Sequence, residues 1–218
     1  MKFGKIFAAS MAAIVTAFVV ATPAKAALVG VSGDNASTGF AAEIIGAPGQ
    51  VLNGTVFNTH QQGFDEAQNV LLGADLIGDS GVIASSGMRV DSHMIFLNKQ
   101  NGVSGNISHN NVVWEFSGMI LGVMSDIDGD LEAATSSFLG HDDTTYPSAF
   151  DNRGMEGNDM YSILGNELTV NMFVTQPGDW IRVVTVSAVP LPAALPLYGA
   201  GVALMGFLGW RRRKNAAA

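Results

Sequence analysis

One short segment concentrates acidic side chains whose chemistry suits a hard metal ion. It carries carboxylates at alternate positions: Asp126, Asp128, Asp130 and Glu132. Acids that alternate along a turn can direct several oxygens at one Ca²⁺. The segment is not an EF-hand, because Gly129 takes the fourth position of the loop and Ser137 the twelfth. Calcium binding is one interpretation of the segment, and a solvated acidic loop is the other. Further acids could add ligands: Asp142, Asp143, Asp151, Glu156 and Asp159.

Aromatic side chains offer a second kind of chemistry, because their flat faces can stack on sugar rings. Trp114 shares a predicted strand face with Val112 and Phe116, which indicates a core position. Trp180 follows a turn-like Pro-Gly-Asp sequence and is the candidate for stacking on a ligand.

The residue types that carry most enzyme chemistry are scattered. The chain has no cysteine, which excludes a thiol nucleophile and cysteine-ligated metals. Its four histidines show no HExxH spacing, and it has neither a Gly-x-Ser-x-Gly elbow nor a phosphate-binding loop. Ser92 and His93 are neighbours on a predicted strand and point to opposite faces, whereas Asp91 shares the face of His93. We therefore expect a protein that is not an enzyme.

The middle of the chain is strongly acidic. Residues 27–187 contain all 19 acidic residues and only 4 basic ones, which leaves a formal charge of -15. A nucleic-acid partner is not expected, because binding phosphates requires clustered Lys and Arg. This stretch is long enough for one domain with a single core.

Both ends of the chain carry the features of export and membrane sorting. Residues 1–5 are basic, residues 6–20 are apolar, and small residues precede a predicted signal-peptidase cut between Ala26 and Ala27. An uncharged run follows at 193–210; as a helix its 18 residues would span about 27 Å, enough for a bilayer core.

A basic stop closes that run: Arg211, Arg212, Arg213 and Lys214, with a short tail at 215–218. By the positive-inside rule, residues 27–187 are expected on the outer side of the inner membrane.

The C-terminal segment 188–214 resembles a known class of sorting signal. Its motif consists of Val189, Pro190, Leu191, Pro192 and Ala193, followed by the predicted transmembrane helix and the basic stop. This order resembles the PEP-CTERM family in its VPLPA variant, with Leu191 where Glu is usual in the name-giving form. The resemblance implies recognition by an exosortase, an integral-membrane protease, in bacteria that make extracellular polysaccharide. A permanent single-pass anchor is the alternative.

The pattern of residues 27–187 predicts an all-β domain, an antiparallel β-sandwich with a jelly roll as one form of it. It also resembles uncharacterised domains that precede such tails. About seven to nine strands are expected, among them 51–57, 88–98, 112–116, 119–124, 161–174 as a hairpin turning at Gly165-Asn166, and 181–187. The segments 112–116 and 119–124 are expected to form a tight hairpin through Ser117-Gly118, and 130–139 a short helix.

These features predict an exported, sorted protein of the cell envelope or extracellular matrix, not catalytic and associated with surface polysaccharide. Two alternatives remain at this level: a secreted enzyme acting on glycan or peptide, and a calcium-dependent self-assembling surface protein. The expected partners are signal peptidase, the exosortase and the polysaccharide, with the inner membrane as a sorting intermediate. The final location is expected to be the cell surface or the medium.

Overall fold

The computed structural model describes residues 27–99, 104–175, 177–187, 201–202 and 205. One compact unit spans Ala24–Val189, and its described part is all-β apart from one short helix, as predicted. Its elements in chain order are β1 (Leu28–Ser32), β2 (Glu43–Ile44), β3 (Gln62–Asp65), β4 (Val70–Leu71), β5 (Leu76–Gly78), β6 (Gly81–Ala84), β7 (Arg89–Asn98), β8 (Ile107–Phe116), β9 (Ile120–Met124), α1 (Asp130–Leu139), β10 (Met160–Leu164), β11 (Glu167–Val174) and β12 (Gly178–Val186).

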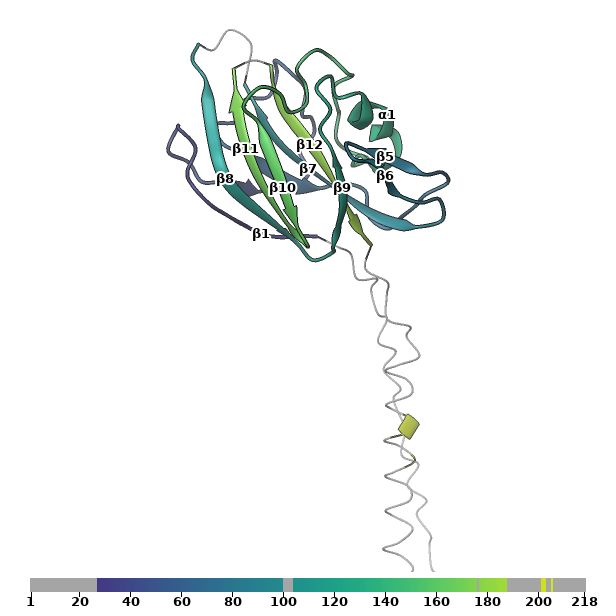
Figure 1. Ribbon diagram of the computed structural model, residues 1–218. Helices are drawn as coiled ribbons and strands as arrows, with labels where there is room; N and C mark the ends of the chain where they lie inside the picture. The colour runs from purple at the N-terminus through teal and green to yellow at the C-terminus, as the bar shows by residue number, and fades with distance from the viewer. Residues whose placement is uncertain (1–26, 100–103, 176, 188–200, 203–204, 206–218) are drawn as a thin grey trace, which may run out of the picture. The chain divides into compact units, whose positions relative to one another are not determined.

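The strands form two main sheets and a small hairpin (Figure 1). The four-stranded sheet has the order β1-β8-β11-β10, and the six-stranded sheet the order β2-β3-β7-β12-β9 with β4 beside β7. β5 and β6 pair only with each other. The described strands pair antiparallel, as predicted, except β2 and β3, which run parallel. The jelly-roll form is wrong, since a jelly roll pairs its first and last strands, whereas β1 and β12 lie in different sheets.

The main core lies between the inner faces of the two sheets. The four-stranded sheet contributes Val112, Trp114 and Phe116, all fully buried, and the six-stranded sheet contributes Ile95 and Ile181 among others. Successive strand residues point to opposite faces, so each strand supplies alternate side chains to this core. The predicted strand faces at 88–98 and 112–116 are confirmed.

The outer face of the six-stranded sheet is covered as well. Met94, Phe96 and Trp180 form a second cluster there with Val51, and α1 and the β5–β6 hairpin pack over a third, as Figure 1 shows at the right. β7 and β12 are buried along both faces, and each carries buried polar side chains, such as His93 and Arg182, among its apolar ones. Val51 and Val56 belong to this cover, and residues 51–57 form no strand, so the strand predicted there is wrong.

Two predicted connections have opposite outcomes. The hairpin of β10 and β11 is confirmed, and Gly165 takes the positive φ of 66° that its two-residue turn requires. The predicted hairpin through Ser117-Gly118 is wrong. β8 pairs with β1 and β11, and β9 pairs with β12, so the chain crosses from one sheet to the other at this point. The predicted helix 130–139 is confirmed as α1.

Candidate metal centre

A tight turn before β10 places two carboxylates side by side. The amide of Asp159 donates to the carbonyl of Glu156 at 3.0 Å, and the amide of Glu156 donates to Asp159 Oδ2 at 3.1 Å. Gly157 inside the turn has a φ of 63°, which favours glycine. A third bond fixes the turn to its neighbour, because Phe173 of β11 donates its amide to Asp159 Oδ1 at 2.6 Å.

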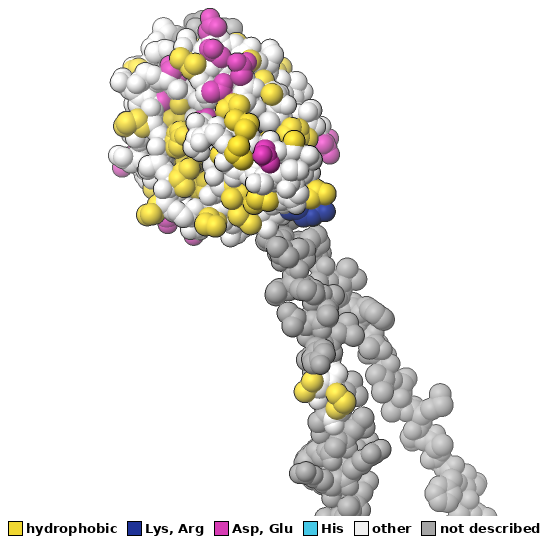
Figure 2. All heavy atoms as spheres, turned by 45° about the vertical axis from the view of Figure 1, so that its right-hand side comes forward, with side chains coloured by type: hydrophobic (Ala, Val, Ile, Leu, Met, Phe, Trp, Pro, Cys, Tyr) yellow, Lys and Arg dark blue, Asp and Glu magenta, His cyan; other side chains and the backbone are white. Residues whose placement is uncertain are grey.

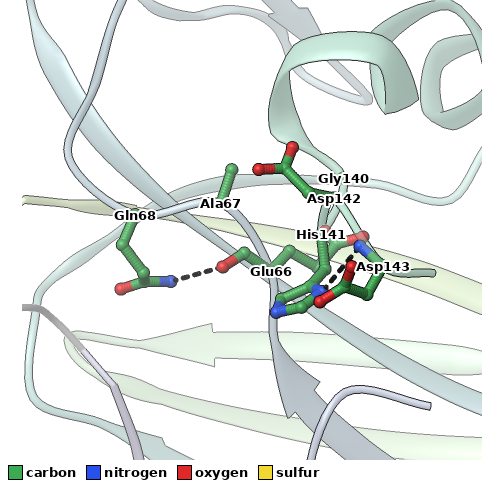
Figure 3. Close-up of a pocket in the computed structure, with 7 residues that line it drawn as sticks. All are labelled: Glu66, Ala67, Gln68, Gly140, His141, Asp142 and Asp143. Atoms are coloured by element: carbon green, nitrogen blue, oxygen red, sulfur yellow. Dashed lines mark hydrogen bonds between the residues drawn. The ribbon is translucent and has the colours of Figure 1, made fainter. Parts of the chain in front are cut away.

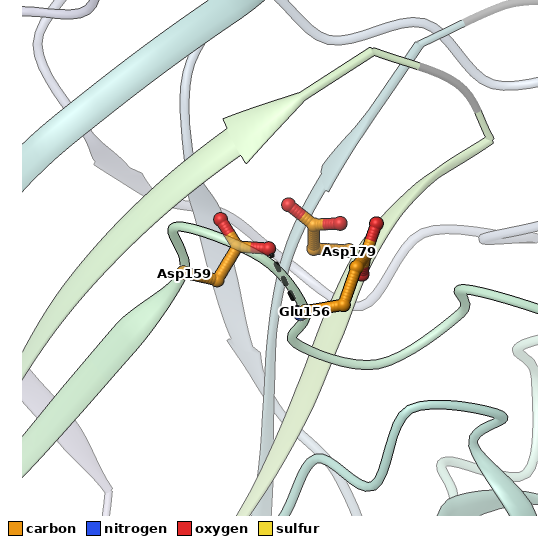
Figure 4. Close-up of side chains that lie close together, drawn as sticks. All are labelled: Glu156, Asp159 and Asp179. Atoms are coloured by element: carbon orange, nitrogen blue, oxygen red, sulfur yellow. Dashed lines mark hydrogen bonds between the residues drawn. The ribbon is translucent and has the colours of Figure 1, made fainter.

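The third carboxylate reaches the same place from the opposite sheet. Asp179 is the second residue of β12, and its side chain lies on the inner face of the sheet with that of Ile181. One carboxylate oxygen from each of Glu156, Asp159 and Asp179 lies within 4.8 Å of the others (Figure 4). The three acids therefore meet at the boundary between the two sheets.

The electrostatics of this cluster are unfavourable to three charges. Burial raises the pKa of Asp179 well above its usual value, and the charges of Asp159 and Glu156 raise it further. Burial also raises the pKa of Glu156 to about 7, with Asp159 adding to the effect. The pKa of Asp159 is raised by burial, against the lowering effect of its two amide donors. No cation is among the causes of these shifts.

Two oxygens of the cluster have no hydrogen-bond donor among the described residues. They are Oδ2 of Asp179, whose side chain is 2 % exposed, and Oε2 of Glu156. A buried carboxylate oxygen without a donor is costly, since it has lost its water without replacement. The arrangement provides oxygen ligands and negative charge, which together suit a hard cation such as Ca²⁺ or Mg²⁺.

The acidic segment singled out in the sequence is used differently. Asp126 accepts hydrogen bonds from the amides of Asp130 and Leu131, at 2.7 and 3.1 Å, and so satisfies the first turn of α1. Asp128 and Asp130 are exposed. Glu132 turns inward and is fully buried. Asp126, Asp128, Asp130 and Glu132 do not gather as three ligands around one point, so the calcium site proposed there finds no support in the described structure.

Glu132 instead belongs to a buried network of opposite charges. Its Oε2 lies 3.5 Å from Nε of Arg153, which is also fully buried. Its carbonyl oxygen accepts from Nη1 of Arg182 at 2.6 Å. Burial raises the pKa of Glu132 to about 8, against the lowering effect of Arg153 and Arg182. Arg182 is in turn paired with Glu66, so two arginines and two acids gather in this part of the interior.

The tryptophan predicted to stack on sugar is a core residue. Trp180 is fully buried, donates Nε1–H to the carbonyl of Val51 at 3.1 Å, and meets the ring of Phe150 edge-on at 5.7 Å. A ring enclosed in this way presents no face to a ligand, so the prediction is wrong. The sequence pattern placed Trp180 in a turn before a strand at 181–187, whereas the structure places it inside β12, where Val51 and Phe150 cover it.

A chain of hydrogen bonds joins an acid, a histidine and a hydroxyl. Nδ1 of His93 lies 2.7 Å from Asp65 Oδ1, and Nε2 lies 3.1 Å from Thr185 Oγ1. This geometry resembles that of a catalytic triad. His93 and Thr185 are both fully buried, and the ring of His93 packs 4.9 Å from that of Phe116. The hydroxyl has no access for a substrate, so we interpret the chain as structural.

One open pocket of about 350 Å³ lies beside the end of α1 (Figure 3). Its lining comprises Glu66, Ala67, Gln68, Gly140, His141, Asp142 and Asp143. His141 Nδ1 accepts the amide of Asp143 at 3.2 Å, while the carboxylates of Asp142 and Asp143 are exposed. The carboxylate of Glu66 is turned away into its pair with Arg182. The pocket is open and mainly polar, and the described residues that line it form no group of three metal ligands.

Of the acids that the sequence offered as additional ligands, Glu156 and Asp159 join the cluster, and Asp151 is exposed. Asp179 was missed. The available signal was an acid beside Trp180 at the start of an apolar strand, because a charge in such a run needs a partner.

Several predicted features lie outside the described residues. They are the signal segment 1–26, the motif Val189, Pro190, Leu191, Pro192 and Ala193, the basic stop Arg211, Arg212, Arg213 and Lys214, and most of the span 193–210. Within the described part of the chain, no helix has the length and apolar character needed to cross a membrane. The chain matches no protein-family model, no curated protein and no solved structure.

Proposed function

We propose that this chain is an exported protein of the bacterial cell envelope or matrix, sorted through a PEP-CTERM-type signal and associated with surface polysaccharide. The observation that carries the proposal is the order of features after residue 188: a VPLPA motif, an uncharged run of 18 residues and four basic residues. The apolar run near Met1, which follows a basic start, predicts the same topology, with residues 27–187 on the outer side of the inner membrane.

The start of the domain fits the predicted signal cleavage. A cut between Ala26 and Ala27 would leave Ala27 as the first residue, and β1 begins directly after it at Leu28. The amide of Leu28 already donates to Asp65 Oδ1 at 2.9 Å. Cleavage at that bond would therefore remove no residue of the first strand.

The distribution of charge does not favour binding to nucleic acids or to anionic lipids. Of the four cationic side chains in 27–187, Lys99, Arg153 and Arg182 are buried, and Arg89 is exposed. Four acids, Glu66, Asp91, Glu132 and Asp179, are buried as well, so the surface keeps nearly all of the negative charge and Arg89 is its one basic side chain among the described residues of 27–187. Figure 2 shows acidic side chains gathered at the upper end of one face, with basic atoms at one small place on that face. Such a surface favours cations and neutral polymers over phosphates.

The lack of access to the His93 chain supports a non-catalytic domain. Its Thr185 hydroxyl is enclosed between the sheets, and the open pocket beside α1 brings no nucleophile and base together. We therefore propose that the domain binds polymer without cleaving it.

Mass spectrometry of the protein from its native host tests the sorting proposal. We expect an N-terminus at Ala27 and a C-terminus near the motif at 189–193. A protein found in the cytosol with Met1 and Ala218 both present would overturn it. Binding is tested with the host's purified polysaccharide: retention on the polymer is expected, and release of reducing ends would show a glycan-cleaving enzyme instead.

A second candidate function is self-assembly along β10. This strand is the outermost described strand of the four-stranded sheet, so its outer backbone groups are free to pair with another strand. Its residues carry no charge, and Met160, Ile163 and Leu164 are 62 %, 41 % and 78 % exposed. Natural edge strands are usually protected by charges or proline, and β10 has neither. The occupant that fits best is β10 of a second copy, because identical strands can pair antiparallel about a two-fold axis.

Sedimentation velocity of the full-length protein in detergent distinguishes this candidate. We expect a concentration-dependent dimer or larger assembly that Ile163→Lys abolishes, because a charge on the edge opposes pairing. A monomer at all concentrations, with and without calcium, would contradict it.

A further inference from the structure

We propose that Glu156, Asp159 and Asp179 bind one Ca²⁺ ion, which joins the turn before β10 to the first residues of β12. The proposal goes beyond the proposed function and does not depend on it, since it concerns the described domain alone.

The first argument is the unpartnered oxygen of a buried side chain. Asp179 is 2 % exposed, and its Oδ2 has no hydrogen-bond donor among the described residues. Its carboxylate lies in the group formed with Glu156 and Asp159, as Figure 4 shows. Oε2 of Glu156 in the same group is likewise without a donor. A cation at this point would supply both oxygens with a partner.

The second argument compares this cluster with the other buried acids of the domain. Glu66 is paired with Arg182 at 2.7 Å, and Glu132 lies 3.5 Å from Arg153. At Asp179 the described charged neighbours are two further carboxylates. Glu66 and Glu132 thus each lie beside an arginine, whereas no described cation lies among the charged neighbours of Asp179.

The third argument is the way in which the turn is built. Both oxygens of Asp159 accept backbone amides, from Glu156 and Phe173, which fixes the carboxylate in place while each oxygen keeps a second lone pair. A carboxylate held in this way loses little freedom on binding an ion.

The ligand set selects the kind of ion. All donors are carboxylate oxygens, which suit hard divalent cations and exclude a preference for soft metals. Ca²⁺ accepts irregular arrangements of six to eight oxygens, whereas Mg²⁺ demands a near-octahedral set. Two acids on one turn and one on a facing strand match the more tolerant ion, with water completing the shell.

Binding of the ion has a structural consequence. Asp179 belongs to the six-stranded sheet, and Asp159 is tied to β11 of the four-stranded sheet. One ion held by both would cross-link the two sheets at this end of the domain. The same ion would order the chain entering β10.

Calorimetric titration of the full-length protein in detergent, after treatment with a chelator, tests the site. With CaCl₂ as the probe we expect saturable binding near one ion per chain and tighter than with MgCl₂. We expect Asp179→Asn and Glu156→Gln each to weaken calcium binding at least tenfold. The matched control is Asp128→Asn, which removes one exposed acid from the other acidic segment and is expected to leave binding unchanged.

The midpoint of thermal unfolding is a second test, and it does not depend on a measurable heat of binding. A ligand that binds only the folded state stabilises it, so at ~100 times Kd the midpoint should rise by about 5–10 °C for a domain of this size. Without calcium, Asp179→Asn should melt no lower than the wild type, because an amide at this buried position never has to carry a charge beside Asp159 and Glu156. Should this variant fail to fold, Glu156→Gln carries the test alone. No midpoint shift in millimolar Ca²⁺, or a shift lost in Asp128→Asn but kept in Glu156→Gln, overturns the proposal.

Discussion

Arg182 and Glu66 form a two-point ion pair in the interior of the domain, with Nε 2.7 Å from Oε2 and Nη2 2.9 Å from Oε1. Both side chains are fully enclosed. The guanidinium lies 5.5 Å from the ring centre of Tyr146 and bonds the last turns of α1 through Thr135 and Ser136. The pair therefore attaches the helix to the six-stranded sheet.

Removing one member of this pair should be strongly destabilising. In Glu66→Gln the guanidinium stays buried without its counter-charge, and such a change costs about 3–5 kcal/mol. The measurement is the free energy of unfolding in urea. The control is Arg89→Met, at an exposed arginine, for which the change is expected within about 0.5 kcal/mol. The double variant Glu66→Gln with Arg182→Met should cost less than the sum of the single changes, and strict additivity would show that the two charges do not compensate each other.

A second prediction concerns the contact between Gly63 and Trp114. A Cβ added at Gly63 would lie 2.6 Å from Cζ3 of Trp114, whose Nε1–H is held by Gln61 Oε1 at 3.0 Å. The ring cannot move away without losing that bond, so Gly63→Ala is expected to cost about 1–3 kcal/mol through overpacking. Gly46→Ala is the matched control, because its Cβ would have nothing within 4 Å. Equal stability of the two variants would contradict the close packing of the sheets at this point.

The sequence predicted which face a residue takes more reliably than it predicted its partner strand. The alternation at 88–98 predicted opposite faces for Ser92 and His93, and in the structure Ser92 donates to Glu66 whereas the ring of His93 packs on Phe116. The same alternation gives no information on which strands pair. The sequence therefore predicted that β9 pairs with β8, its neighbour along the chain, whereas it pairs with β12. Short local turns such as Gly165-Asn166 were predictable, since the preference for a positive φ is encoded in the residues themselves.

The candidate metal site was not predicted from the sequence, for a reason related to the error in strand pairing. Closeness along the chain drew attention to Asp126 and its neighbours, whereas the acids that meet in space come from a turn and a strand twenty or so residues apart. Sequence alone does not tell a buried acid with a cationic partner, such as Glu132, from one without, such as Asp179. That distinction depends on which acids Arg153 and Arg182 contact in the folded domain, and these contacts join segments that are distant in the sequence.

A third prediction follows from the surroundings of His109. Its Nδ1 accepts the amide of Gln61 at 3.0 Å, so its Nε2 carries the proton and donates to the carbonyl of Asp34 at 2.9 Å. Protonation of Nδ1 would break the first bond. Burial lowers the pKa of His109 below 6.5, and nearby His60 lowers it further. As the pH falls, the unfolded chain therefore binds the proton at a higher pH than the folded protein does. The stability that neutral His109 contributes is complete above pH 6.5 and is lost as the pH falls below this value.

Urea unfolding at several pH values between about 7.5 and 5 measures this effect. The wild type should lose stability more steeply than His109→Gln, whose amide oxygen can still accept from Gln61 but does not titrate. His141→Gln, in the open pocket, serves as the control and should follow the wild type. Parallel curves for the wild type and His109→Gln would refute the assignment.

The last prediction separates the two acidic regions by the role of Asp126. Its carboxylate accepts the amides of Asp130 and Leu131, and the N-cap residue Gly129 has no side chain to do so. Asp126→Ala leaves these amides without an acceptor and should destabilise the protein by about 0.5–2 kcal/mol, as removal of a helix cap does. Asp126→Asn keeps an acceptor oxygen and should recover most of this stability. Both variants should retain the full calcium response, because the ion is assigned to Glu156, Asp159 and Asp179. If Asp126→Asn instead abolished calcium binding while the fold was kept, the acid would be a ligand, and the segment first singled out in the sequence would be the site.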